Sequence, residues 1–155
     1  MARFYVYDLS KECGYISDEW SLPADGLYES FDFKNYFEEA SRKAYLIKAD
    51  DEIAGFVLLN QATIYDSSEW NVGEFFILGK HQGKGVGKQV AEKIFQLHQG
   101  NWEVSVIPEN RSALTFWENI IDHFTSGNFI KETKLIDYNK HQPKRIIFTL
   151  NSDVL

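Results

Sequence analysis

The chain has 155 residues, of which 44% are hydrophobic, and carries 23 acidic against 16 basic side chains. This length predicts one domain over residues 1–155, and the formal net charge of −7 argues against nucleic-acid binding, which requires a basic surface. Because the sequence has no apolar run of membrane-spanning length, no signal-peptide pattern and only one cysteine, Cys13, we expect a cytoplasmic protein without disulfides or a catalytic thiol.

The first half of the chain predicts a helix and a hairpin after an ambiguous opening segment. Residues 4–10 are rich in aromatic and β-branched side chains, a composition that favours a strand. Residues 28–43 predict a helix, because their aromatic residues recur at helical spacing. Residues 44–49 and 53–62 predict two strands of a hairpin, since the acidic residues between them are typical of a turn.

The second half alternates between strands and helices. Glycine and asparagine follow the first of these helices and predict its end. Such an alternation predicts a three-layer α/β domain around a mixed central sheet. In chain order we predict a strand over 69–78, a helix over 85–98, a strand over 102–107, a helix over 110–123 and strands near 128–136 and 144–151.

A glycine-rich turn, His-Gln-Gly-Lys-Gly-Val-Gly-Lys over residues 81–88, joins an apolar strand to an amphipathic helix. Free backbone N–H groups and the positive end of the helix dipole meet there, an arrangement that suits a phosphate or pyrophosphate. The spacing of the glycines fits neither the nucleoside-triphosphate loop nor the dinucleotide fingerprint. It satisfies Q-x-x-G-x-G, through Gln82, Gly85 and Gly87.

A second pattern follows one helix and one strand later. Residues 110–117 read Asn-Arg-Ser-Ala-Leu-Thr-Phe-Trp and begin a predicted helix. The two patterns together resemble the coenzyme A signatures of the GNAT (general N-acetyltransferase) superfamily, Q-x-x-G-x-G and N-x-x-A-x-x-F-Y. The resemblance covers about residues 44–150. It also favours a helix over residues 4–10, in which case the family's first strand is missing.

This resemblance implies that the chain transfers an acetyl group from acetyl-coenzyme A to a primary amine of a small molecule or protein. The amine would attack directly in a ternary complex. The strand before the turn would bind the pantetheine arm, the turn would hold the pyrophosphate, and the start of the second helix would contact the coenzyme. The residues implied in coenzyme binding are Phe75, Phe76, Ile77, Gln82, Gly83, Lys84, Gly85, Val86, Gly87, Lys88, Asn110, Phe116 and Trp117.

Glu74 is the candidate general base, because it is a carboxylate inside an otherwise apolar strand. Burial would raise its pKa toward the working pH, although the same residue could instead pair with a cation or face solvent. Asp66 and Glu69 are weaker candidates. The family's usual acid is a tyrosine at the position of Trp117, whose indole N–H can donate a hydrogen bond to sulfur but cannot release a proton. Tyr138 is a candidate substitute.

The acceptor is predicted only by class. Residues 1–69 carry 6 basic and 14 acidic side chains, whereas residues 70–155 carry 10 basic and 9 acidic ones. An acidic acceptor side favours a cationic amine, although it would equally keep the protein soluble. The candidate aromatic residues of the acceptor cleft, which are also candidate core residues, are Trp20, Tyr28, Phe31, Phe33, Tyr36 and Trp70.

Two other functions stay open. A non-catalytic module that senses acyl-coenzyme A is favoured by Trp117 and by the short N-terminus, and a protein of the same fold could bind another anionic nucleotide. A homodimer also stays open. The histidines show no ligand spacing, so no metal site is predicted, and His81 is expected to be a solvated loop residue.

Overall fold

The computed structural model describes residues 1–153, which form a six-stranded mixed sheet in the order β1-β2-β3-β4-β6-β5. All neighbouring strands are antiparallel except β3 and β4, which are parallel. The predicted three-layer α/β fold with a mixed central sheet is confirmed. The strands are β1 (Lys43–Ala49), β2 (Glu52–Asn60), β3 (Trp70–Ile77), β4 (Asn101–Val106), β5 (Ile130–Leu135) and β6 (Lys144–Asn151).

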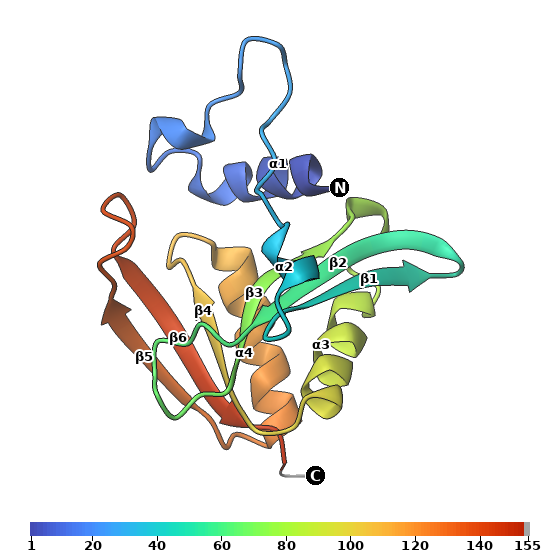
Figure 1. The fold of residues 1–155 in the computed structure, drawn as a ribbon, viewed down its shortest axis with the longest axis vertical. Helices are drawn as coiled ribbons and strands as arrows, with labels where there is room; N and C mark the ends of the chain where they lie inside the picture. Colours follow the sequence, from blue (N-terminus) through green and yellow to red (C-terminus); the bar gives the residue numbers. More distant parts are fainter. Residues whose placement is uncertain (154–155) are drawn as a thin grey trace.

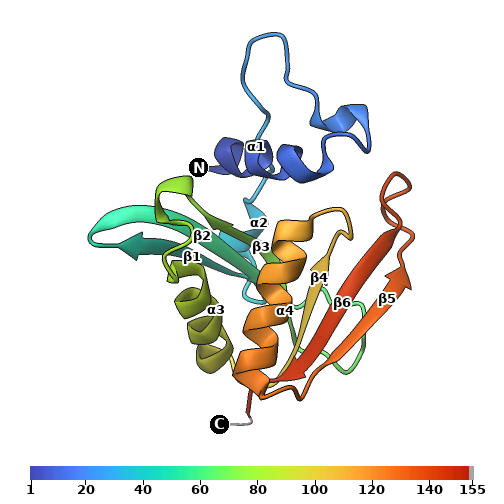
Figure 2. The same cartoon turned by 180° about the vertical axis from the view of Figure 1, so that it is seen from behind.

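Two long helices cover one face of the sheet, and a third lies across its end (Figures 1 and 2). Helices α3 (Val86–Leu97) and α4 (Arg111–Thr125) pack side by side on the first face, whereas α1 (Ala2–Cys13) lies beyond the end at which α4 begins. The single-turn helix α2 (Asn35–Glu38) lies on the opposite face from α3 and α4. No helix within residues 1–153 has both the length and the hydrophobicity needed to cross a membrane.

The main hydrophobic core lies between the sheet and the helices α3 and α4. The apolar side of α3 brings Ile94 and Phe95 against Trp102 of β4, and α4 contributes Trp117 and Ile121. A smaller cluster forms on the other face of the hairpin, where Phe56, Leu58 and Phe76 pack against aromatic residues from α1 and α2. The helical spacing of apolar residues therefore predicts α3 and α4 correctly, because each buries only one side.

The opening segment is helical, as the family resemblance implies, and the strand favoured by its composition is wrong. Val6 and Cys13, seven residues apart, are both buried on one side of α1. Every strand of the described sheet comes after residue 42, so the N-terminal segment contributes none. Burial of one side of the segment outweighs strand propensity here, since propensity reflects packing context more than backbone preference.

The predicted helix over residues 28–43 is wrong for most of its length, because only Asn35–Glu38 is helical. Phe33 and Tyr36 pack against the Phe56 cluster, whereas Phe37 is 77% exposed. The Asp32 carboxylate accepts a hydrogen bond from the backbone N–H of Lys34 and so favours a turn. The aromatic residues are thus buried by separate contacts along an extended segment, and a continuous helix is not needed.

The loop between β2 and β3 is attached to the sheet through a buried carboxylate. Glu103 of β4 is 1% exposed and accepts hydrogen bonds from the backbone N–H groups of Ile64, at 2.6 Å, and Tyr65, at 3.2 Å. Two charge-assisted hydrogen bonds compensate for the burial of this side chain. Glu103 therefore anchors the middle of this loop, at Ile64 and Tyr65, to β4.

We predict that Glu103→Gln lowers the free energy of unfolding by about 1–3 kcal/mol, because an amide can accept from only one of the two N–H groups and turns its own NH2 toward the other. Urea denaturation measures the change. Asp66→Asn, an exposed carboxylate of the same loop, is the control and should change stability by less than about 0.5 kcal/mol. Equal effects of the two substitutions would contradict the anchoring role of Glu103.

Candidate active site

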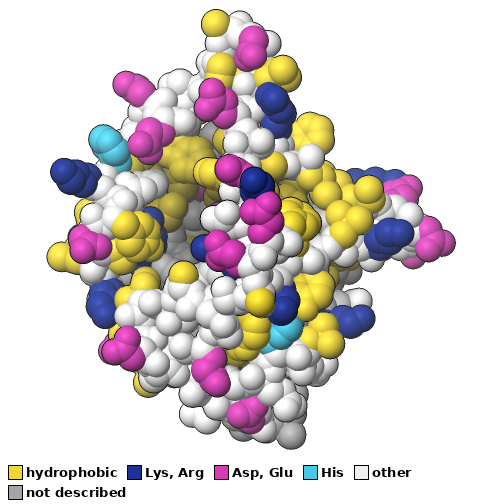
Figure 3. Space-filling view, in the orientation of Figure 1, with side chains coloured by type: hydrophobic (Ala, Val, Ile, Leu, Met, Phe, Trp, Pro, Cys, Tyr) yellow, Lys and Arg dark blue, Asp and Glu magenta, His cyan; other side chains and the backbone are white. Residues whose placement is uncertain are grey.

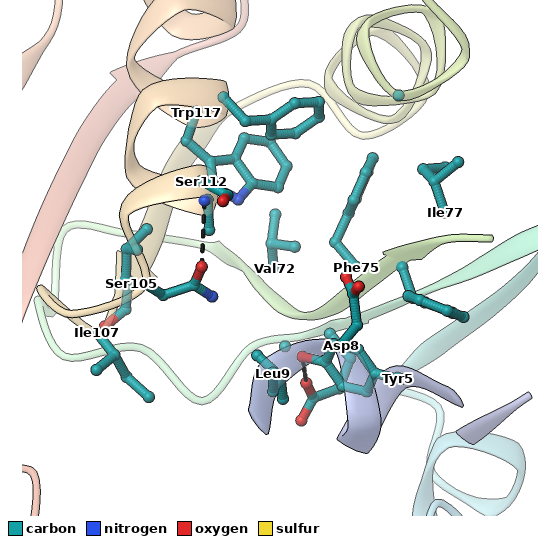
Figure 4. A pocket seen from close by; sticks show the side chains of 18 of the residues that line it. Tyr5, Asp8, Leu9, Val72, Phe75, Ile77, Ser105, Ile107, Ser112 and Trp117 are labelled. Carbon is teal, nitrogen blue, oxygen red and sulfur yellow. Dashed lines mark hydrogen bonds between the residues drawn. The ribbon is translucent and has the colours of Figure 1, made fainter. Parts of the chain in front are cut away.

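A cleft of about 1030 Å³ opens where β3 and β4 separate. The two strands pair only at Trp70 with Trp102 and at Asn71 with Glu103, after which β3 stays with β2 and β4 stays with β6. Figure 3 shows this face of the molecule hollowed below α1, with hydrophobic side chains along the rim. In Figure 4, Tyr5, Asp8 and Leu9 of α1 lie on one side of the cleft, and Ser112 and Trp117 of α4 lie on the other.

A β-bulge directs Glu74 into this cleft. Leu58 of β2 pairs with Glu74 and Leu59 pairs with Val72, so Gly73 is an extra residue without a partner. Val72 points to the α3 and α4 side, and regular alternation would turn Glu74 the same way. The extra residue instead turns Glu74 toward α1. An added Cβ at position 73 would meet the Tyr36 hydroxyl and lie 2.7 Å from Asn60 Nδ2, so a larger residue there requires these two side chains to move.

Glu74 occupies an environment that suits a proton acceptor near neutral pH. Burial raises the pKa of its carboxyl to about 7, and the hydroxyl of Tyr5 donates a hydrogen bond to Oε2 that partly offsets this rise. Burial, followed by the charge of Glu74, raises the pKa of Tyr5 well above its ordinary value, so this tyrosine stays protonated as a donor. The Glu74 side chain is therefore partly buried, and its hydrogen-bond partner is a helix-borne tyrosine rather than a cation.

The glycine-rich turn begins α3 at the mouth of the cleft, which Gln82, Gly83, Gly85, Gly87 and Lys88 line. Gly85 is the N-cap residue with φ +80°, a conformation that side chains disfavour. A Cβ at Gly87 would lie 2.8 Å from the ring of Phe116, so α3 and α4 approach closely here. The turn therefore leaves the first N–H groups of α3 free of side chains that would block an anion.

Three details of this turn differ from a freely solvated loop. The amide of Gln82 donates a hydrogen bond to the carbonyl of Ile77 at 2.7 Å and ties the turn to the end of β3. His81 is buried, 3.5 Å from the carboxylate of Glu52, so the expectation of a solvated histidine is wrong. Val86 packs against the core, and Lys84 is exposed outside the cleft lining.

The second sequence pattern places α4 against the same cleft. Asn110 is the N-cap residue and accepts a hydrogen bond from the backbone N–H of Ala113 at 3.2 Å. The Trp117 ring packs edge-on against Phe75 with 5.0 Å between ring centroids, and Phe116 lies at 5.4 Å from the same ring. Phe75, Phe76 and Ile77 all line the cleft, as do Phe116 and Trp117.

The remaining candidates divide between the cleft and other parts of the fold. Tyr138, in the turn between β5 and β6, lines the cleft, as do Trp20, Phe31 and Tyr36. Glu69 accepts a hydrogen bond from the Asn101 backbone at the other end of β3 and, like Asp66, Tyr28 and Phe33, does not line the described cleft. Trp70 packs against Trp102 in the core, and Cys13 is a buried thiol whose pKa burial raises to about 11.

Several polar residues of the cleft were not predicted from the sequence. The amide of Asn71 donates to Asn60 Oδ1 at 3.1 Å, and the amide of Asn60 donates to the Tyr36 hydroxyl at 2.8 Å. Gln142 and Arg145, near the start of β6, line the opposite wall and are both buried. No local spacing joins these residues, so the sequence carries no signal for them.

Comparison with known proteins identifies the class to which this fold and cleft belong. The profile of the Acetyltransferase (GNAT) family matches residues 4–120. The chain therefore belongs to the GNAT acetyltransferase family, whose members are acyl-coenzyme A-dependent transferases. No protein of curated function has significant sequence similarity to it.

Solved structures share the fold at low sequence identity. An acetyltransferase from Thermus thermophilus superposes with a TM-score of 0.60 and 15% identity, over 97% of this chain and 93% of that one. A spermidine N-acetyltransferase chimera from Vibrio cholerae and hSSAT gives 0.58 and 16%, over 99% and 93%. A GNAT acetyltransferase from Elizabethkingia anophelis, solved with acetyl-CoA bound, gives 0.54 and 14%, over 76% and 80%.

We predict that Tyr5→Phe raises the pKa of Glu74 above its value of about 7, because the hydroxyl donates to the ionised carboxylate and its loss favours the protonated form. Carboxyl-detected NMR titration of Glu74 measures the shift. Tyr7→Phe, an exposed position of the same helix, is the control and should leave the titration unchanged. An unchanged or lower pKa in Tyr5→Phe would show that this hydrogen bond does not tune Glu74.

Proposed function

We propose that residues 1–155 act as one acetyl-coenzyme A-dependent N-acetyltransferase domain, with Glu74 as the general base. The observation that carries this proposal is a carboxyl group with a pKa of about 7 in the cleft where β3 leaves β4. A base of that pKa is half ionised at neutral pH and can still accept a proton from an ammonium group. The proposed acceptor is a primary amine of a small molecule.

The cleft has the features that the coenzyme requires. Beyond Asn71, the backbone edge of β3 that faces β4 has no strand partner, so its polar groups are free to bind the pantetheine amides. The N–H groups from Gln82 to Lys88 and the dipole of α3 would hold the pyrophosphate. Asn110, Phe116 and Trp117 would contact the coenzyme from α4. The coenzyme itself supplies an activated acetyl thioester.

Each group then has a defined part in the transfer. Glu74 accepts a proton from the acceptor ammonium, directly or through water, and the freed nitrogen attacks the thioester carbonyl carbon. Backbone N–H groups of β3 near that carbonyl stabilise the negative charge on its oxygen. The carbon–sulfur bond breaks as the amide forms, the thiolate leaves, and the nitrogen releases its second proton to the thiolate or to water. The Trp117 indole N–H, which cannot supply a proton, stabilises the departing sulfur by hydrogen bonding.

A second candidate function is an acyl-coenzyme A sensor that binds the coenzyme without turnover. Trp117, at the family's usual tyrosine position, favours it, because the usual proton donor is missing. A thiolate is a tolerable leaving group near neutral pH, since free thiols titrate at about 8.5. The loss of an acid therefore does not by itself abolish catalysis. Turnover of acetyl-coenzyme A in the presence of amines separates the two functions.

We predict that acetyl-coenzyme A at 100 times its Kd raises the free energy of unfolding by about 2.7 kcal/mol, and that Gly85→Glu abolishes this increase. A glutamate side chain at this position would be strained at φ +80° and would bring a negative charge to the proposed pyrophosphate site. Denaturation with and without the coenzyme measures both effects.

Gln96→Glu adds the same charge near the exposed end of α3 and serves as the control. It should keep the full stabilisation by acetyl-coenzyme A. If the wild type is not stabilised, the proposed coenzyme site is refuted. The transition of the ligand-free Gly85→Glu variant establishes that this variant is folded.

We also predict that Glu74→Gln lowers turnover by about 100-fold or more and keeps the stabilisation by acetyl-coenzyme A, because an amide cannot accept the ammonium proton. Release of free thiol during acetylation of an amine panel measures turnover. Asp66→Asn, in the neighbouring loop and outside the cleft lining, should retain wild-type rates. Full activity of Glu74→Gln would remove Glu74 from the mechanism.

A further inference from the structure

The buried polar atoms without partners all belong to the cleft. Within residues 1–153, four buried side-chain polar atoms lack a hydrogen-bond partner: Trp20 Nε1, Asn71 Oδ1, Ser105 Oγ and Gln142 Nε2. Every one of these residues lines the cleft. Buried polar groups are nearly always paired in folded proteins, so these four atoms are free to bind a ligand or water in the cleft. Trp20 Nε1 and Gln142 Nε2 are donors, Ser105 Oγ can donate, and Asn71 Oδ1 is an acceptor.

A buried cation accompanies these atoms. Arg145 is 8% exposed and lines the same cleft, and its Nη1 donates to the backbone carbonyls of Gln142 and, at 2.8 Å, Lys144. Among the residues that the structure describes, no carboxylate lies within 4.0 Å of its guanidinium. A buried charge without a counter-ion is costly, and the two carbonyls use only one of its nitrogens.

Ser105 and Arg145 lie on the face of the sheet that is opposite α4. Ser105 pairs with Ile147, two residues after Arg145, so the two side chains share a face of β4 and β6. The flanking residues Val104 and Phe148 point to the other face, toward α4. Glu74 also points away from that core, toward α1. The side chains of Glu74 and Arg145 therefore lie on the same side of the sheet. Arg145 has two backbone carbonyls and the Tyr138 ring, at 5.8 Å, as partners but no carboxylate.

The chemistry of this wall selects a carboxylate. A guanidinium, the Gln142 amide and the Trp20 indole all donate hydrogen bonds, and the Ser105 hydroxyl can donate as well. A carboxylate offers two oxygens, a negative charge and no donor, and it matches the planar guanidinium. At this wall the distal ammonium of a diamine would instead meet the buried charge of Arg145, although Asp8 and Glu19 of the N-terminal segment also line the cleft. We propose that the acceptor is an amino acid-like molecule, whose amine faces Glu74 and whose carboxylate binds Arg145.

This inference rests on the proposed function for the amine and narrows its substrate class. Arg145 has two possible roles, a structural role in the turn before β6 and a role in binding the substrate carboxylate. If Arg145 only clamps the turn before β6 through the two carbonyls, its loss disturbs every substrate equally. If it binds the substrate carboxylate, its loss affects only substrates that carry one. The ratio of rates on matched substrates distinguishes these cases, because a structural defect cancels in the ratio.

The test compares three kinds of acceptor of equal chain length: amino acids with 1–5 methylene groups between amine and carboxylate, their carboxamides, and diamines. Thiol release from acetyl-coenzyme A gives kcat/KM for each. We expect the best amino acid to exceed its carboxamide by about tenfold to a hundredfold, the range for a hydrogen-bonded charge pair. A wild-type protein that acetylates the carboxamide or the diamine equally well overturns the inference and leaves the acetyltransferase function intact.

Substitutions near the start of β6 test whether Arg145 binds the carboxylate of the substrate. The measured quantity is the ratio of kcat/KM for the amino acid to that for its carboxamide. We expect Arg145→Gln to bring the acid-to-amide ratio near one and Gln142→Leu to lower it severalfold, because the latter removes an unpartnered donor but keeps the backbone carbonyl that Arg145 binds. Lys140→Gln removes an exposed charge from the same turn and should keep the ratio. An unchanged ratio in Arg145→Gln refutes the assignment.

A binding measurement tests the carboxylate site at Arg145 independently of the proposed acetyltransferase activity. If no amine is acetylated, the proposed catalytic function fails, but calorimetric titration of the same amino acids still decides the carboxylate site. Binding to the wild type that is weakened at least tenfold in Arg145→Gln and preserved in Lys140→Gln supports the site. No binding, or equal binding to the wild type and Arg145→Gln, overturns it.

Discussion

The separation of β3 from β4 is the constraint on which the rest of the site depends. Two pairs of residues join the strands, and beyond them each strand continues with its other neighbour. The sheet thus keeps its hydrogen bonds on both outer sides while a cleft of about 1030 Å³ opens in its middle. Because α3 and α4 begin beside this opening, the glycine-rich turn and Asn110 line the same cavity.

The bulge at Gly73 converts this opening into a site with two different sides. Because of the extra residue, Val72 points into the main core and Glu74 points toward α1. One short strand therefore contributes to the core on one face and to the cleft on the other. Helix α1 then covers Glu74, and burial with the Tyr5 hydrogen bond sets a pKa of about 7. The N-terminal helix therefore shapes the proposed active site, although it contributes no strand to the described sheet.

Local patterns in the sequence were sufficient for the elements that depend on near neighbours. Helices α3 and α4, the hairpin of β1 and β2, and the strands β3 to β6 follow from spacing and turn residues, with bounds within a few positions. The turn over residues 81–88 and the start of α4 also carry their own signatures. Residues 4–10 and 28–43 were different, because contacts distant in sequence decide their conformation: the pairing of Tyr5 with Glu74, and the packing of Phe33 on Phe56.

By itself, the sequence determined the α/β class, the family resemblance, the glycine turn and a carboxylate in an apolar strand. Only the tertiary structure decided how these residues act. The bulge depends on strand register, and the pKa of Glu74 depends on burial under a helix whose Tyr5 is 69 residues away. Arg145, Ser105 and Trp20 line one cleft only when β4, β6 and the N-terminal segment come together. The pKa of Glu74 and the lack of a carboxylate beside Arg145 both depend on which groups surround these side chains. Those surroundings form only when the chain folds.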